Sequence, residues 1–154
     1  MRVKVEAPNL QRLITVLGSG QVVSKELRRA FTLSSLRVRD RAQRYAPVDQ
    51  GHLRRSIANR VDPSLYPSYA EVGTNLEYAK AVHEGRPPGK MPPVKALEAW
   101  AKKRGLNAWA VAKSIEKKGT KPNPFLANAL QDSAKEITGE FEDALERMVS
   151  QWGN

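Results

Sequence analysis

The two histidines and a few carboxylates and serines are the side chains of this sequence that could support catalysis or bind a metal. His52 and His83 are the only histidines, and neither belongs to a His-Glu-x-x-His zinc motif. His83 and Glu84 are adjacent, and adjacent side chains point to different sides of a helix. The absence of cysteine excludes disulfides, thiolate catalysis and cysteine-bearing zinc or iron–sulfur sites. We therefore expect no cofactor and no metal.

A metal-dependent nuclease would suit a basic protein, and Asp62 and Glu71 lie near expected strands. The residues after Glu71 are Val and Gly, without the lysine that follows in nucleases of that kind, and no second carboxylate is placed to share a metal. Ser56, Ser64 and Ser68 stand in no nucleophile elbow. The sequence therefore predicts a protein that is not an enzyme.

The net charge of +10 over 154 residues is unevenly distributed along the chain. Residues 1–60 hold thirteen Lys and Arg against four Asp and Glu, whereas residues 121–154 hold three against six. Opposite ends of this kind can attract a polyanion at one end and a basic neighbour, including another copy of the chain, at the other. The alternative is ordinary solvated surface charge.

A long basic helix is expected over residues 22–45, because its apolar residues recur at spacings of three and four. The expected buried stripe is Val23, Leu27, Ala30, Phe31, Ser34, Val38, Ala42 and Tyr45. The cations between them, continued into the next turn, form a predicted face for a polyanion or an acidic partner: Arg28, Arg29, Arg37, Arg41, Arg44, Arg54 and Arg55. No recognition helix or interleaved aromatic residue accompanies this face, so any contact with nucleic acid should be non-specific.

The turn over residues 46–57 separates the helical first part of the chain from short strand-like runs. Pro47 should end the preceding helix, since proline disfavours helical dihedrals in the residue before it. Asp49 is expected to cap the new turn by accepting from backbone amides such as that of Gly51. Leu53 and Ile57, four residues apart, should bury one side of it. Taken alone, these residues could simply join two helices.

The string Pro-Val-Asp-x-Gly-x-Leu-Arg-x-Ser-Ile after a basic helix resembles the signature of a family of tailed-bacteriophage neck proteins, called head–tail joining, minor tail or tail-completion proteins. That family usually has Thr where this chain has Gln50, and a residue other than His52 two positions later. The resemblance spans roughly residues 42–130, with a subgroup's pattern at 91–100. Its motif residues, in the family's order, are Pro47, Asp49, Gly51, Leu53, Ser56, Tyr78, Glu84, Gly85, Pro124, Phe125 and Leu126.

The resemblance implies a structural virion protein of the phage neck. Such a protein would form a ring at the head–tail junction that completes or joins the tail and lets DNA pass. Its partners would be its own copies, other connector and tail proteins and, non-specifically, phage DNA; it would assemble in the host cytoplasm. No apolar run approaches the roughly 20 residues of a membrane span. The alternatives are a non-catalytic nucleic-acid-binding protein and, less favoured, a metal-dependent nuclease.

The remaining patterns predict a single α+β domain over residues 1–154, with a small, mainly antiparallel sheet flanked by a long helix in the N-terminal half and a long C-terminal helix. The expected strands cover 2–6, 57–61 and 69–73. The other expected helices cover 10–17, which a glycine pair at 18–20 ends, and 76–83, 94–104, 107–117 and 124–151. Asn107 is expected to cap the helix at 107–117, and Gly139 to weaken the last helix. The side chains expected on the buried sides of these helices include Tyr78, Ala79, Trp109, Ala134 and Trp152.

Residues 85–93 are expected to form an exposed, irregular arm, because four of the nine are prolines, which lack a backbone donor. A stiff segment loses little entropy on docking. We therefore expect Arg86, Lys90 and Met91 to contact a neighbouring subunit or neck protein. The alternative is a proline-rich surface loop.

Overall fold

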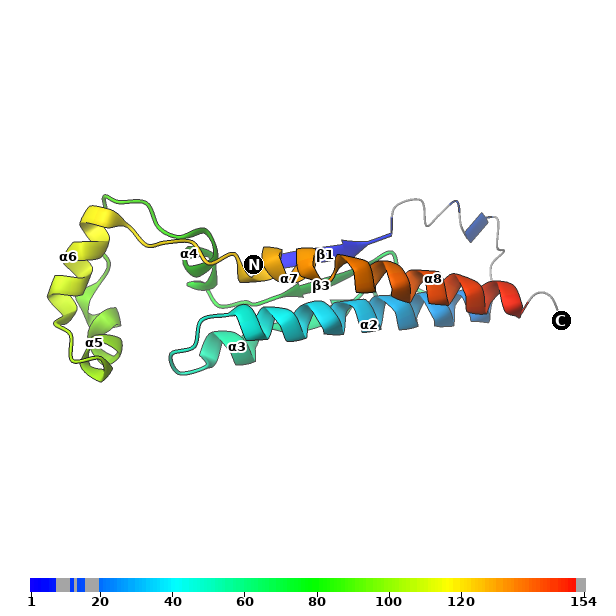
Figure 1. The fold of residues 1–154 in the computed structure, drawn as a ribbon, viewed down its shortest axis with the longest axis horizontal. Helices are drawn as coiled ribbons and strands as arrows, with labels where there is room; N and C mark the ends of the chain where they lie inside the picture. Colours follow the sequence, from blue (N-terminus) through cyan, green and yellow to red (C-terminus); the bar gives the residue numbers. More distant parts are fainter. Residues whose placement is uncertain (8–11, 13, 16–19, 152–154) are drawn as a thin grey trace.

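The computed structural model describes residues 1–7, 12, 14, 15 and 20–151. Most of the expected helix at 10–17, most of the glycine pair at 18–20, and Trp152 lie outside the described residues. The fold is α+β, as predicted: a three-stranded antiparallel sheet with long helices beside it (Figure 1). No helix in the described part of the chain combines the length and apolar character that a bilayer span requires.

Helix α2, Gln21–Tyr45, is the spine of the fold and confirms the long helix expected from periodicity. Its stripe is buried as predicted, with Phe31 and Val38 at 0% exposure. Tyr45 is the exception, because it lies at the end of the helix and is 39% exposed. Its hydroxyl donates to the Asp132 carboxylate over 2.7 Å. The prediction that Tyr45 is buried was therefore wrong.

The sheet consists of β1 (Arg2–Glu6), β2 (Ala58–Val61) and β3 (Tyr69–Gly73) in the order β1-β3-β2, all antiparallel. Alternation along β3 buries Ala70 and Val72, as expected for a strand with one face on a core. That face packs on α2, and β1 also contacts the first C-terminal helix. All three predicted strands are confirmed.

The C-terminal region contains two helices where one was expected: α7, Phe125–Asp132, and α8, Ala134–Ser150. Ser133 separates them, and its hydroxyl donates to the Ala129 carbonyl over 2.7 Å. A serine that bonds to its own helix backbone in this way competes with the regular ladder. Sequence reasoning expected weakness at Gly139 instead. After the break, Ala134 is exposed, against the predicted stripe.

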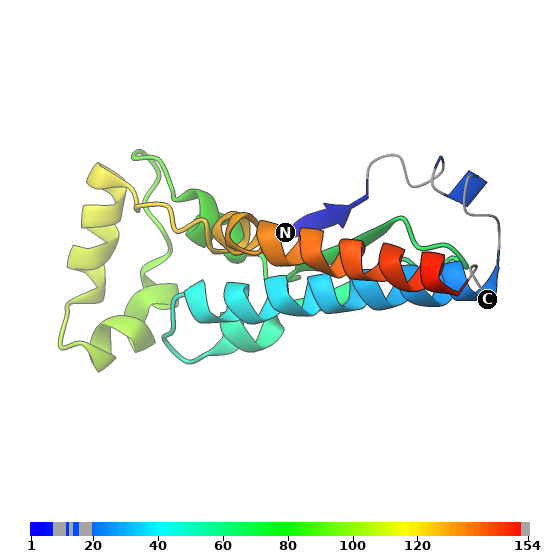
Figure 2. The same ribbon diagram turned by 45° about the vertical axis from the view of Figure 1, so that its right-hand side comes forward.

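Helices α7 and α8 lie along α2, and the sheet lies beside them (Figures 1 and 2). Two short helices complete this part of the molecule: α3, His52–Ser56, and α4, Ala79–Glu84. We call the sheet together with α2, α3, α4, α7 and α8 the body. The buried residues of the body form one continuous hydrophobic core.

Helices α5, Val94–Lys103, and α6, Ala108–Lys118, pack on each other at one end of the molecule (Figures 1 and 2). We call residues 86–122 the hairpin lobe. Asn107 caps α6 as predicted, since its side chain accepts from the amides of Trp109 and Ala110. Trp109 is 58% exposed, so its predicted place in a buried stripe was wrong.

Candidate functional site

The turn that carries the predicted family signature folds largely as its residues require. Helix α2 ends at Tyr45, two residues before Pro47. Gly51 has φ of +75°, a left-handed conformation that side chains other than glycine rarely adopt. Leu53 and Ile57 are 4% and 2% exposed. The expected helix stop, tight bend and buried pair are therefore confirmed.

Asp49 does not cap this turn, contrary to our prediction. The N-terminus of α3 has no side-chain cap. The Asp49 carboxylate instead accepts from Arg104 Nη1 over 3.1 Å and lies 3.8 Å from Lys103 Nζ. It thereby joins the body to the hairpin lobe. Such a partly exposed pair contributes only about 0–1 kcal/mol, so it positions the lobe more than it stabilises the fold.

The Ser56 hydroxyl joins the signature turn to the sheet. Its Oγ donates to the Leu53 carbonyl over 2.7 Å and lies 2.7 Å from Thr74 Oγ1. The backbone of Thr74 in turn bonds in both directions with Met1. The signature turn is thus tied to the ends of β3 and β1, a link that spacing in the sequence could not reveal.

The later motif residues also have packing partners. Phe125 and Leu126 are fully buried, and Pro124 stands directly before α7. His83 meets the Phe125 ring edge-on at 5.4 Å, and its Nε2 accepts from the Ala127 amide over 3.4 Å. Burial lowers the pKa of His83, with a small opposing effect from Glu84. His83 is therefore a neutral cap on α7.

The residues around α4 depart partly from expectation. Tyr78 is 48% exposed, although we expected it to pack inward. Ala79 is fully buried, as predicted. Glu84 is exposed with Lys80 Nζ at 4.0 Å, and Gly85 ends the helix with φ of +73°.

Much of the basic face of α2 is neutralised within the chain. Arg37 Nε donates to Glu140 over 2.9 Å, and Arg41 Nη1 donates to Glu136 over 3.0 Å. The bond with Arg41 lowers the pKa of Glu136. These acids belong to α8, whose charge was expected to serve neighbouring molecules. Arginines that looked uncompensated in the sequence are therefore paired across the helix interface.

Arg28 of this face is engaged as well, because it donates to the carbonyls of Asp62 and Ser64. In the opposite sense, Arg147 of α8 donates to the buried Glu26 of α2 over 2.5 Å. Four of the seven predicted residues are exposed and have no carboxylate partner among the described residues: Arg29, Arg44, Arg54 and Arg55.

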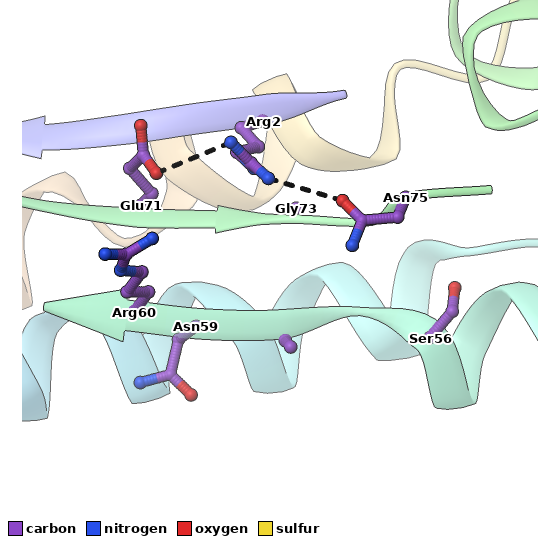
Figure 3. Close-up of a pocket in the computed structure, with 8 residues that line it drawn as sticks. Arg2, Ser56, Asn59, Arg60, Glu71, Gly73 and Asn75 are labelled. Carbon is purple, nitrogen blue, oxygen red and sulfur yellow. Dashed lines mark hydrogen bonds and ion pairs between the residues drawn. The ribbon is translucent and has the colours of Figure 1, made fainter. Parts of the chain in front are cut away.

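The carboxylates weighed as nuclease candidates are engaged structurally. Asp62 accepts from the amides and hydroxyls of Ser64 and Ser68, which lowers its pKa to about 2 and orders the β2–β3 loop. Glu71 lies 3.8 Å from Arg2 in a small polar hollow on the sheet (Figure 3). Within the described residues, no group of three or more His, Asp or Glu side chains is placed to hold a metal.

The hollow in Figure 3 is lined mainly by polar and charged groups that already have partners. Arg2 donates to Asn75 Oδ1 over 3.3 Å as well as pairing with Glu71. Ser56 belongs to the signature turn described above. The arrangement can hold the edge of the sheet together, and it offers no nucleophile beside a base.

The proline-rich segment 85–93 has no helix or strand, as predicted, but it is not free of hydrogen bonds. Arg86 pairs with Thr120 in an isolated antiparallel bridge, and the Gly89 amide donates to the Glu116 carbonyl over 2.8 Å. Lys90 is exposed and Met91 is partly buried. The segment is therefore the first of two crossings that connect the body to the hairpin lobe. Its contact with a neighbouring subunit stays a prediction.

Residues 11–85 match the family described as "Bacteriophage HK97-gp10, putative tail-component". Over these residues the protein matches a phage tail-component family. The match runs from before α2 through the signature turn to the end of α4, so the predicted resemblance is confirmed there. It supports a structural tail protein of the virion.

The motif residues at 91–100 and 124–126 lie outside the matched segment, and their family role stays a prediction. No curated protein and no solved structure matches the chain.

Proposed function

We propose that this tail component is a subunit of the phage neck. It forms a ring at the head–tail junction, completes or joins the tail, and lets DNA pass. It acts without catalysis, through shape and charge. The observation that carries the proposal is the family match over 11–85, because those residues build the spine α2, the signature turn and the centre of the sheet.

The use of the motif side chains supports a structural role. Ser56 ties the turn to the sheet, and Asp49 holds the hairpin lobe. Partners would be further copies of the chain and the connector and tail proteins on either side. Large apolar side chains stand exposed on the body for such contacts, among them Val48 at 52%, Leu65 at 66% and Val149 at 56%. Burial of such groups is the main favourable contribution to association.

The direct test is a phage in which this gene carries an early stop codon. We expect filled heads and complete tails that do not join, seen by electron microscopy, with joining restored by the intact gene supplied in the host. Normal particles, or a complete absence of tails, would contradict a role in joining.

The ring itself requires a second measurement. Native mass spectrometry of the purified protein, alone and with its head-side and tail-side partners, should show one closed multi-subunit species. The control variant Lys80→Gln removes only an exposed helical pair with Glu84, and it should form the same multi-subunit species as the wild type. A monomer under every condition would argue against the ring and leave the tail-component assignment standing.

A further inference from the structure

The hairpin lobe holds most of the net charge of the protein. Residues 86–122 contain ten Lys and Arg against two Asp and Glu, which gives +8. The rest of the chain contains sixteen against fourteen, which gives +2. A sequence-wide profile had placed the excess in the first 60 residues, where packing against α8 then neutralises part of it. The charge that solvent meets is therefore concentrated in the lobe.

Most cations of the lobe have no acidic partner among the described residues. Three are paired: Lys103 and Arg104 with Asp49, and Lys113 with Glu116 at 3.6 Å. Arg86 is half-buried. The exposed and unpaired ones are Lys90, Lys95, Lys102, Lys117, Lys118 and Lys121.

The lobe carries these cations on two short helices and on the crossings that lead to them, outside the common core of the body. Helices α5 and α6 have ten and eleven residues, so each is roughly 15 Å long. They lie at one end of the molecule in both views (Figures 1 and 2). Duplex DNA carries one charge per about 1.7 Å of axis, so a surface of this length spans roughly nine phosphate charges. The lobe thus matches DNA in both sign and scale.

We propose that the hairpin lobe binds the phosphate backbone of duplex DNA without reading its sequence. Eight of its ten cations are lysines, which act as point charges for phosphate and are depleted at protein–protein interfaces. An acidic protein surface would be the competing partner. The exposed acids of α8, namely Glu142, Asp143 and Glu146, are too few to match the lobe charge for charge.

The biological meaning of this contact rests on the proposed neck position, because DNA crosses the head–tail junction. The binding itself is a property of the isolated chain and can be measured without a ring. Failure of DNA binding would leave the ring and joining tests unaffected, and a failed ring would leave the DNA measurement valid.

Trp109 provides a local signal for binding. It is 58% exposed on α6, with Lys113 Nζ 5.6 Å from the centre of its ring. DNA bound over the lobe should change its fluorescence. Trp109→Phe should keep most of the affinity and lose most of that change, whereas an unaltered fluorescence change in this variant would place the contact elsewhere.

The decisive experiment compares two sets of four substitutions that remove equal charge. The lobe set is Lys95→Gln, Lys102→Gln, Lys117→Gln and Lys118→Gln. The body set removes the exposed cations of the face predicted from sequence: Arg29→Gln, Arg44→Gln, Arg54→Gln and Arg55→Gln. Affinity for fluorescent 30-base-pair duplexes of two unrelated sequences is measured by anisotropy at several salt concentrations.

We expect the wild type to bind both duplexes equally. The lobe set should weaken binding by about tenfold or more at low salt, and should reduce the slope of log K against log salt by roughly three to four. The body set should change affinity by less than about twofold. Thermal unfolding of both sets should match the wild type, since all eight side chains are exposed.

The proposal fails if the body set weakens binding as much as the lobe set, if the lobe set binds normally, or if the two duplexes differ clearly in affinity. It also fails if the lobe set leaves DNA binding intact and changes the assembly mass with the tail or connector partners. That result would assign the lobe to an acidic protein.

Discussion

The body and the hairpin lobe are both rich in cations, but they use them differently. In the body, Arg37, Arg41 and Arg147 reach carboxylates on the facing helix. In the lobe, the lysines of α5 and α6 largely face solvent. The comparison teaches that a charge profile along a sequence becomes a surface property only after helix pairing has been taken into account.

The body and the hairpin lobe also differ in their apolar packing. The body has one core that runs from the sheet through α2 to α8. In the lobe, only Ala101 and Ala112 are fully enclosed among the helical residues, with larger side chains such as Trp100 half-covered. We therefore expect the body to determine global stability and the lobe to open locally at a lower free energy.

The largest expected effect that tests this difference is Phe125→Ala in the body. Phe125 is fully buried against the common core, so its loss should cost about 3–5 kcal/mol of unfolding free energy. Urea denaturation followed by far-ultraviolet circular dichroism measures it. The matched lobe variant Ile115→Ala should leave that transition in place and alter hydrogen exchange in α5 and α6 only. A shared loss of stability would show that the two regions unfold as one.

A smaller effect is expected from removing one charge of a partly buried pair in the body. Glu26→Gln leaves the Arg147 guanidinium without its carboxylate, while the Glu26 side chain is only 5% exposed. Its melting temperature should fall by a few degrees. The control Glu116→Gln removes an exposed pair in the lobe and should change the melting temperature by less than about one degree. An equal fall in melting temperature in the two variants would show that the pair in the body stabilises the fold no more than the exposed pair in the lobe does.

The smallest expected effect is a pH dependence confined to the body. The pKa of His83 lies below its usual 6.5, so the unfolded chain takes up this proton at higher pH than the folded one. The stability contributed by neutral His83 is present above about pH 6.5 and is lost as the pH falls below it. His83→Gln should flatten the melting temperature between pH 7 and 5.5, and an unchanged slope would rule out this cap.

In the His83→Gln variant, a second loss of stability should remain at lower pH. The pKa values of Glu136 and Asp62 are lowered by their hydrogen bonds, with Asp62 at about 2. Their contributions are present above the unfolded values near 4 and disappear as the pH falls further.

Local signals in the sequence predicted the elements well. Alternation identified the strands, periodicity identified α2, and Pro47 and Gly51 marked the turn. Asn107 was recognised as a cap because capping acts within three residues. These features depend on neighbouring residues in the chain, which a single sequence displays directly.

The predictions that failed depend on contacts with residues distant in the sequence, or on how the helices pack against each other. Asp49 bonds to a residue 55 positions away, and Arg41 to one 95 positions away. No feature of the neighbouring residues in the sequence indicates either contact. The break at Ser133 involves neither glycine nor proline. Trp109 has the spacing of a core residue, yet among the described elements α5 and α6 pack mainly on each other, which leaves this side chain exposed.

The bridge between Arg86 and Thr120 has a consequence for how this chain can vary. It places the two ends of the excursion into the hairpin lobe directly opposite each other, at the roughly 5 Å separation of an antiparallel pair. A segment with adjacent ends can be exchanged or deleted while the remaining chain closes with a two-residue connection. The geometry of the two ends would therefore let the lobe be lengthened, shortened or replaced while the helices and sheet of the body keep their contacts.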